Sequence, residues 1–137
     1  MKPITVPGNL DALELISDYI MSAAQVAGLE KKATYNLRLA VDEIATNIII
    51  HGYEEAGKDG MVEIKGILDE QALTIVLEDT GEKYDPTQKP DQDDLDLPLE
   101  ARQIGGLGVF LAIQSVDKFS YERIGEKNRN TFVVNLT

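Results

Sequence analysis

Three side chains with different chemistry follow one another at four-residue steps in the segment LRLAVDEIATNIIIHGY, residues 37–53. They are a carboxylic acid, Glu43, an amide, Asn47, and an imidazole, His51. At 3.6 residues per turn, this spacing places all three on one face of a helix. The rest of the helix is largely apolar, so we expect Glu43 and Asn47 to be partly enclosed. Enclosed polar groups usually have partners, because burying one without a hydrogen bond costs about 2–7 kcal/mol.

An acid and an amide one helical turn apart suit a site for a metal ion and a phosphate. The side-chain oxygen of Asn47 can ligate Mg²⁺, which takes few protein ligands and leaves room for phosphate and water. The carboxylate of Glu43 can orient or deprotonate an attacking hydroxyl. A solvated helix face is the competing interpretation, and on these residues alone both stay open.

A second candidate lies in LEDTGEKYDP, residues 77–86, where Asp79 ends an expected strand and Gly81 follows. The Asp79 carboxylate can accept a hydrogen bond from an exocyclic amine such as that of adenine. Gly81, without a side chain, would let a base approach the backbone closely. An acid and a glycine are also common in ordinary turns, so this pattern alone does not decide between binding and structure.

A third candidate is IGGLGVFLA, residues 104–112. Gly105, Gly106 and Gly108 stand immediately before an apolar helix, and they predict a flexible turn whose free N–H groups gather at the helix N-terminus. Oriented N–H donors and the helix dipole bind phosphate there. The segment is not a Walker loop, because no Gly-Lys-Ser/Thr follows, and it is not a dinucleotide fingerprint, because it lacks the preceding buried parallel strand and the expected spacing.

The remaining patterns predict one α+β domain over residues 1–137, a two-layer sandwich with a mixed, mostly antiparallel sheet and helices on one face. The expected elements are an edge strand at 2–6, a helix at 8–28, a second helix from 29 that closes near Gly52, a hairpin at 60–79 turning at 69–71, an irregular loop at 80–104, a glycine-rich turn opening a helix at 105–116, and a last hairpin of 117–124 and 130–137 around GEKNRN.

Composition limits the partners. The net charge is −11, from 24 acidic and 13 basic residues, which disfavours nucleic acid and anionic membranes. The chain has no cysteine and one histidine, which excludes thiolate and histidine-rich metal sites. No apolar run approaches the roughly 20 residues that span a bilayer. The N-terminus lacks the basic and apolar segments of a signal peptide, so we expect a cytoplasmic protein.

Taken together and in order, AVDEIATNIIIHGY, EDTGEKYDP and GGLGVFLA closely resemble the N, G1 and G2 boxes of the gyrase/histidine-kinase/MutL ATPase superfamily. The short chain, HGY after the first box, DTGEKYDP and GGLGVFL look like the anti-sigma factor serine kinases of bacteria. The resemblance covers nearly the whole chain and implies the Bergerat ATP-binding fold, with ATP and Mg²⁺ as cofactors.

The resemblance also implies roles by position. Asn47 would ligate the Mg²⁺ that bridges the ATP phosphates, Glu43 would act as general base, and His51 would border the pocket. Asp79 would contact the adenine amino group, with Gly81 beside it.

The same resemblance assigns residues 82–104 to a lid. The segment around the last glycines would wrap the phosphates, and it comprises Gly105, Gly106, Leu107 and Gly108, with Arg102 as a phosphate or partner contact. The DQDDLD sequence within the expected lid is richer in aspartate than the family pattern, which affects how the lid would close.

Two functions follow. The first is an ATP-dependent protein-serine kinase that phosphorylates a STAS-type antagonist protein, also binds a sigma factor, and acts as a homodimer. The alternative is a regulatory binding protein that uses ATP or ADP as a conformational switch without phosphorylating its partner. The retained Asp42-Glu43 pair and Asn47 favour the kinase, since a protein that only binds nucleotide does not need the acid.

Overall fold

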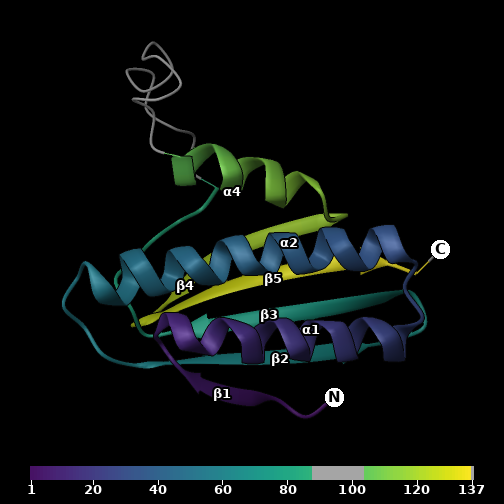
Figure 1. Cartoon of the computed structure of the whole chain (residues 1–137), viewed down its shortest axis with the longest axis horizontal. Coiled ribbons are helices and arrows are strands. Elements are labelled where there is room, and N and C mark those ends of the chain that lie inside the picture. Colours follow the sequence, from purple (N-terminus) through teal and green to yellow (C-terminus); the bar gives the residue numbers. More distant parts are fainter. Residues whose placement is uncertain (88–103, 137) are drawn as a thin grey trace.

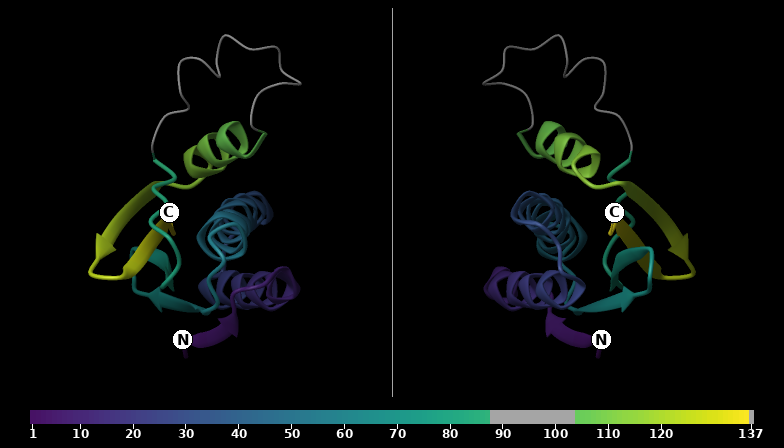
Figure 2. Two further views of the ribbon diagram at one scale, coloured as in Figure 1. Left: turned by 90° about the vertical axis from the view of Figure 1, so that its left-hand side faces the viewer. Right: turned by 90° about the vertical axis from the view of Figure 1, so that its right-hand side faces the viewer.

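The protein's structure is a computed structural model that describes residues 1–87 and 104–136. In this part of the chain, an antiparallel sheet carries helices on one of its faces (Figures 1 and 2). The strands are β1 (Ile4–Pro7), β2 (Met61–Leu68), β3 (Ala72–Asp79), β4 (Lys118–Ile124) and β5 (Lys127–Asn135). The helices are η1 (Leu10–Ala12), α1 (Leu13–Ala27), α2 (Lys31–Asn47), η2 (Ile48–Glu54) and α4 (Ile104–Gln114).

The strand order β1-β2-β3-β5-β4 places β3 at the centre of the sheet. Two hairpins, β2–β3 and β4–β5, supply most of it, and α4 precedes β4 in the crossing from β3. The register sets Asp79 of β3 opposite Val62 of β2 and Asn128 of β5. The end of β3 is therefore flanked by a strand on each side.

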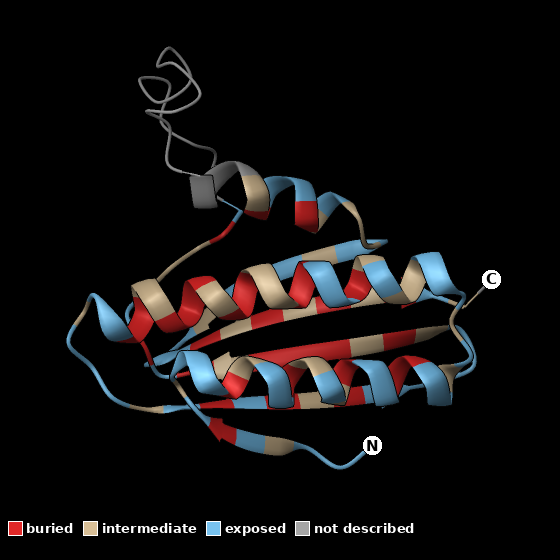
Figure 3. Cartoon of the chain, in the orientation of Figure 1, coloured by how far each residue is buried: buried red, intermediate tan, exposed pale blue. Residues whose placement is uncertain are grey.

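The core lies between the inner face of the sheet and the buried faces of α1 and α2 (Figure 3). Alternate residues of β3 face the helices, as the two-residue period of a strand requires. Fully burying a leucine, isoleucine or valine side chain contributes about 1.5–3 kcal/mol to the stability of the fold. The largest buried aliphatic side chains include Ile16, Ile20, Leu37, Val41, Ile44, Leu73, Ile75 and Leu77.

The predicted α+β fold, with helices on one face of the sheet, is confirmed, and every strand pair among the described residues is antiparallel. The edge position of the first strand and the turn of the β2–β3 hairpin are also as predicted. In that turn, Asp69 Oδ1 accepts hydrogen bonds from the backbone N–H groups of Gln71 (2.7 Å) and Ala72 (2.9 Å).

The second helical stretch ends at Glu54, close to the predicted end near Gly52, but its last part is not α-helical. At Ile48 it passes from α-helix into the π-helical segment η2, which continues to Glu54. A π-helical turn holds more residues than an α-helical one, so a four-residue step no longer keeps His51 directly above Asn47. π-helical turns are frequent at functional sites.

Two further boundaries differ. Gly105, Gly106 and Gly108 lie inside α4, which begins at Ile104, and do not form a turn before it. The last hairpin turns at Gly125 and Glu126 alone, with Gly125 supplying the positive φ (60°) that a two-residue loop requires. The predicted turn therefore contained residues 127–129, which in fact begin β5.

Candidate nucleotide-binding site

The Asp79 side chain ends β3 on the inner, helix-facing side of the sheet and is only 3% exposed. Its Oδ1 atom accepts hydrogen bonds from the backbone N–H of Gly81 (2.9 Å) and from Nδ2 of Asn128 (2.9 Å). Its Oδ2 atom is buried and has no hydrogen-bond partner among the described residues. A buried acceptor without a partner is costly, so Asp79 fits a ligand that brings a donor.

Burial raises the pKa of the Asp79 carboxyl above its ordinary value. The hydrogen bonds from Asn128 and Gly81 and the charge of Arg123 act in the opposite direction and do not cancel the effect of burial. The side-chain oxygen of Asn130, on the same face of β5, is a second buried acceptor without a partner among the described residues. This end of the sheet thus presents acceptors to an incoming donor group.

The loop after Asp79 is tied to the helix end. Gly52 O accepts a hydrogen bond from Glu82 N (2.9 Å), and a Cβ added at Gly81 would lie 2.8 Å from the same oxygen. The sequence predicted that Gly81 makes room for a base. In the structure, Gly81 comes close to the backbone of η2. This approach joins the loop after Asp79 to the helix that carries Asn47.

Tyr53 is a site-building residue that the sequence analysis missed. Its hydroxyl accepts a hydrogen bond from Thr80 N (2.9 Å) and donates one to Met61 O (2.6 Å), and its side chain is buried. Gly8 and Gly60 leave room for its ring, since a Cβ at either would come within 2.6 Å of it. A buried tyrosine needs a partner for its hydroxyl. The hydrogen bond between the Tyr53 hydroxyl and Thr80 N positions the residue after Asp79.

Glu43 and Asn47 lie in consecutive turns of α2. Asn47 is 5% exposed, and its Nδ2 donates a hydrogen bond to the backbone oxygen of Glu43 (2.7 Å). Because the amide nitrogen is engaged, the amide oxygen is the atom left to act as a ligand. The glycine segment, residues 105–108, lies beside this pair, since a Cβ added at Gly108 of α4 would lie 3.3 Å from Glu43 Oε2. The structure therefore unites residues of the first and third candidates.

The His51 ring contacts two side chains of the same protein, Glu55 and Tyr84. Its Nδ1 lies 2.9 Å from Glu55 Oε2, and its ring stacks on Tyr84 with centroids 5.3 Å apart and planes at 19°. Tyr84 comes from the loop after β3, so this stack is a further connection between that loop and η2. The role of His51 as a border of the nucleotide pocket stays a prediction.

The glycine segment is described in part. Gly105, Gly106 and Leu107 belong to the first turn of α4, where a helix has N–H groups without intrahelical partners. Phosphate binding by this turn stays a prediction. Arg102, and residues 88–103 of the expected lid, lie outside the described residues.

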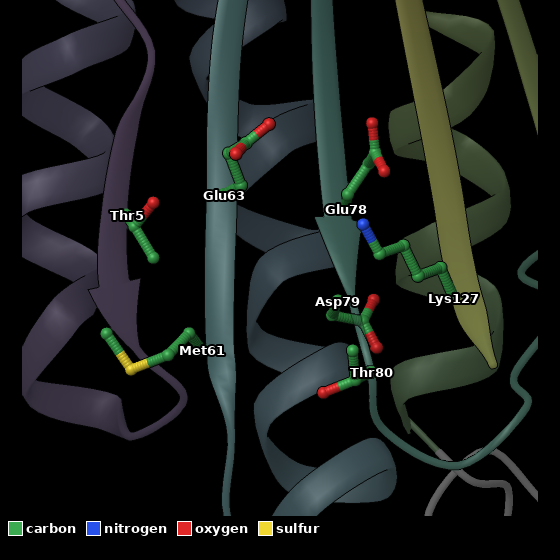
Figure 4. Close-up of a pocket in the computed structure, with 7 residues that line it drawn as sticks. All are labelled: Thr5, Met61, Glu63, Glu78, Asp79, Thr80 and Lys127. Atoms are coloured by element: carbon green, nitrogen blue, oxygen red, sulfur yellow. The ribbon is translucent and has the colours of Figure 1, made fainter.

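A hollow on the opposite, outer face of the sheet includes Asp79 and Thr80 in its lining but no residue of the helices (Figure 4). Its lining comprises Thr5, Met61, Glu63, Glu78, Asp79, Thr80 and Lys127. Figure 4 shows the Lys127 side chain extending toward Glu78, with the helices behind the strands. Neither Glu43 nor Gly108 borders this hollow, so the candidate site lies on the helix side of β3.

Asn128 is the other residue of the candidate site that the sequence analysis missed, because GEKNRN was interpreted as a turn. A signal was present: Asn128, Asn130, Phe132 and Val134 alternate with a period of two, and all four are buried. The predicted strand already began at Asn130, and extending its alternation backwards by two residues would have added Asn128 to it.

Among the described residues, no group of three or more histidine, cysteine, aspartate or glutamate side chains is arranged to hold a metal ion. In residues 1–87 and 104–136, no helix combines the length and the apolar character needed to cross a membrane.

An α+β sandwich with an acid at the end of its central strand, and an acid–amide pair on the covering helix, defines a class of nucleotide-binding ATPase domains. The chain matches the family model described as "Histidine kinase-like ATPase domain" over residues 6–134. It therefore belongs to that family, and the predicted membership of the gyrase/histidine-kinase/MutL superfamily is confirmed.

Relatives and solved structures agree with this assignment. The chain is 29% identical over 119 residues to a protein named "Serine-protein kinase RsbW" from Bacillus pumilus, covering 82% of this chain and 72% of the relative. The protein of the same name from Staphylococcus aureus (strain bovine RF122 / ET3-1) is 28% identical over 116 residues, covering 82% and 73%. The predicted resemblance to serine kinases is thus confirmed.

Two solved histidine kinases share the fold. The histidine kinase domain of the blue-light activated kinase of Erythrobacter litoralis EL346 has a TM-score of 0.58 and 17% identity, over 90% of this chain and 59% of that one. The Acinetobacter baumannii histidine kinase AdeS has a TM-score of 0.52 and 16% identity, over 100% of this chain and 68% of that one. These likenesses bear out the predicted Bergerat-type fold.

Proposed function

We propose that the chain is an ATP-dependent protein-serine kinase whose phosphoacceptor is a serine on a STAS-type antagonist protein, and that it also binds a sigma factor. Family membership and relatives named serine-protein kinase support this proposal. The observation that carries it is the packing of Gly108 against the Glu43 carboxylate. A protein that only bound nucleotide would not need an acid beside the glycine segment.

ATP fits the residues at the end of β3, namely Asp79, Gly81 and Asn128, which we call the base end of the site. The buried Oδ2 atom of Asp79 has no partner among the described residues, and the exocyclic amine of adenine is a donor of the kind it lacks. Gly81 N and Asn128 already saturate Oδ1, so the free oxygen is well defined. These residues would hold and select the base.

Mg²⁺ fits the part of the site where Glu43 and Asn47 of α2 meet Gly108 of α4, which we call the phosphate end. A single amide oxygen, that of Asn47, suits an ion that keeps several waters and binds phosphate oxygens. When bound with ATP, Mg²⁺ would offset the charge of the phosphates. Asn47 would hold it, and the N–H groups at the start of α4 would donate hydrogen bonds to phosphate oxygens.

Glu43 would carry the proton transfer. The acceptor serine hydroxyl gives its proton to the Glu43 carboxylate while its oxygen bonds to the γ-phosphorus, and the bond between that phosphorus and ADP breaks. The rest of the rate enhancement would come from positioning the two substrates.

The wider proposal follows the family resemblance. Residues 1–137 would form one ATPase domain that acts in the cytoplasm as a homodimer. Nucleic acid and anionic membranes would not be partners, because the net charge of −11 opposes both.

The test has two stages. Mg-ATP and Mg-ADP are titrated calorimetrically into the wild type and into Asp79→Asn, where we expect affinity to fall roughly 10- to 100-fold with loss of a charged acceptor. Transfer of labelled γ-phosphate is then measured to a purified STAS-type protein and to its serine-to-alanine variant. Absence of nucleotide binding would overturn the proposal. Tight nucleotide-dependent partner binding without transfer would instead establish the switch protein.

A further inference from the structure

Asn128, at the start of β5, is among the most enclosed polar residues described, with 2% of its surface exposed. Its Nδ2 donates to Asp79 Oδ1 (2.9 Å), to Glu82 O (3.1 Å) and to Gly81 O (3.3 Å). One amide group thus contacts both the Asp79 side chain and the backbone of the loop that follows it. The register explains the meeting, because Asn128 is the β5 partner of Asp79.

Tyr121 of β4 fixes which way this amide points. Its hydroxyl donates a hydrogen bond to Asn128 Oδ1. An amide has an accepting oxygen at one side and a donating nitrogen at the other, so a hydroxyl that donates to the oxygen turns the nitrogen toward Asp79. Arg123 of the same strand also donates a hydrogen bond to Gly81 O (3.1 Å) and so helps to hold the loop.

This arrangement decides which Asp79 oxygen is available. The two donors at Oδ1, Gly81 N and Asn128 Nδ2, hold the carboxylate in one orientation and satisfy one oxygen. The other oxygen is enclosed and has no partner among the described residues. A carboxylate that lost the Asn128 donor would be free to rotate, and either oxygen could then turn toward Gly81.

We propose that Asn128, oriented by Tyr121, is a positioning residue that sets the base selectivity of the nucleotide site by holding Asp79 with one oxygen free for an exocyclic amine. The inference rests on the proposed function and deepens it. The substrate class that it specifies is a purine nucleotide with an amino group at position 6, and nucleotides without that donor bind more weakly.

A merely structural role makes a different prediction. If Asn128 only braces the loop through Gly81 and Glu82, removing it weakens every nucleotide by the same factor. If it acts through Asp79, it weakens only the ligand that uses Asp79. The ratio of two affinities separates these cases, whereas a single affinity does not.

The experiment is calorimetric titration of Mg-ATP and of the Mg complex of purine riboside triphosphate, which lacks the 6-amino group, into four proteins. They are the wild type, Asn128→Ala, Tyr121→Phe and the control Asn135→Ala, whose exposed side chain is at the far end of β5. We expect the wild type to prefer ATP by about tenfold or more. The preference should shrink about fivefold in Asn128→Ala, shrink less in Tyr121→Phe, and stay unchanged in the control.

Equal losses for both nucleotides in Asn128→Ala would overturn the inference and leave the proposed function in place. A wild type that binds neither nucleotide would overturn both. If circular dichroism shows that Asn128→Ala is unfolded, Tyr121→Phe decides, since it keeps Asn128 and removes only the orienting hydroxyl. An unchanged preference in folded Tyr121→Phe then contradicts the proposal.

A double variant adds a direct check of the route through Asp79. In an Asp79→Asn background the preference for ATP is already reduced, so adding Asn128→Ala should change the ratio no further. A further drop of the same size as in the wild-type background would show that Asn128 acts independently of Asp79.

Discussion

The base end and the phosphate end of the candidate site are built from different parts of the fold. At the base end, Asp79 and Asn128 stand on paired strands, and Asp79 Oδ1 accepts two hydrogen bonds from within the chain. At the phosphate end, Glu43 and Asn47 stand on α2 and meet Gly108 of α4. The sheet thus presents an acceptor that is already oriented, while two helices share the residues that we propose for catalysis and phosphate binding.

Two glycines show how differently the ends would respond to change. A Cβ at Gly81 would lie 2.8 Å from the backbone oxygen of Gly52, whereas a Cβ at Gly108 would lie 3.3 Å from the tip of the Glu43 side chain. Backbone at a helix end cannot give way cheaply, but a long side chain can rotate. The base end is therefore rigid, and the phosphate end can adjust when a ligand arrives.

The largest expected effect comes from removing the acid at the phosphate end. Glu43→Gln keeps the shape of the side chain but cannot accept the serine proton, so phosphotransfer should fall about 10²- to 10⁴-fold. Affinity for Mg-ATP should change little, because the base end is untouched. Single-turnover transfer of labelled phosphate and calorimetric titration measure the two quantities.

Asp42→Asn is the matched control, since Asp42 is the preceding acid on the same helix and pairs with Arg38 at 3.6 Å. We expect transfer within about threefold of the wild type, as for other substitutions outside the reacting centre. A loss in Asp42→Asn as large as in Glu43→Gln would take the base role away from Glu43.

The second effect comes from breaking the base end through its backbone. Gly81→Ala must displace the loop or the end of η2, because the added methyl meets Gly52 O. Overpacking of this kind costs about 1–3 kcal/mol. Urea denaturation monitored by circular dichroism should show that loss, together with weaker ATP binding. Unchanged stability would mean that the contact between the loop and the helix end is not rigid.

The third effect is the counterpart at the phosphate end. Alanine is better than glycine inside a helix by about 0.5–1 kcal/mol, so Gly108→Ala should leave stability unchanged or raise it. The added methyl must nevertheless push the Glu43 carboxylate aside by a few tenths of an ångström. Transfer should then slow by about several-fold, since small displacements of a reacting group are costly. A variant that is more stable and equally fast would mean that the space beside Glu43 is not needed.

What the sequence could and could not predict follows the same division. The phosphate end depends on spacing within one helix, and the four-residue step from Glu43 to Asn47 was enough to place them together. The change to π-helix at Ile48 left no trace in the apolar pattern, so the position of His51 was predicted less well.

The base end depends on pairing between strands that are distant in sequence. Asp79 was identified, but its partner Asn128 is 49 residues away and lies in a segment rich in residues that favour turns. Register and turn length decide that pairing, and a shift of one residue would turn Asn128 to the outer face. The rule that buried polar groups need partners would have predicted that Asp79 has one, but not which residue it is.

The smallest expected effect concerns pH and again separates the ends. Burial raises the pKa of Asp79 in the folded protein above its value in the unfolded chain, so the folded state holds the proton more firmly. The wild type's free energy of unfolding therefore carries a penalty above the folded pKa, and the penalty disappears as pH falls below the unfolded pKa. Asp79→Asn has no such proton. Its Tm relative to the wild type should be highest near neutrality and fall by a few degrees at most on acidification. Calorimetric scans across acidic pH measure the difference, in which contributions of the other carboxyls cancel. A constant difference would mean that the enclosure of Asp79 does not disfavour its charge, and the base end would then be as open to water as the phosphate end.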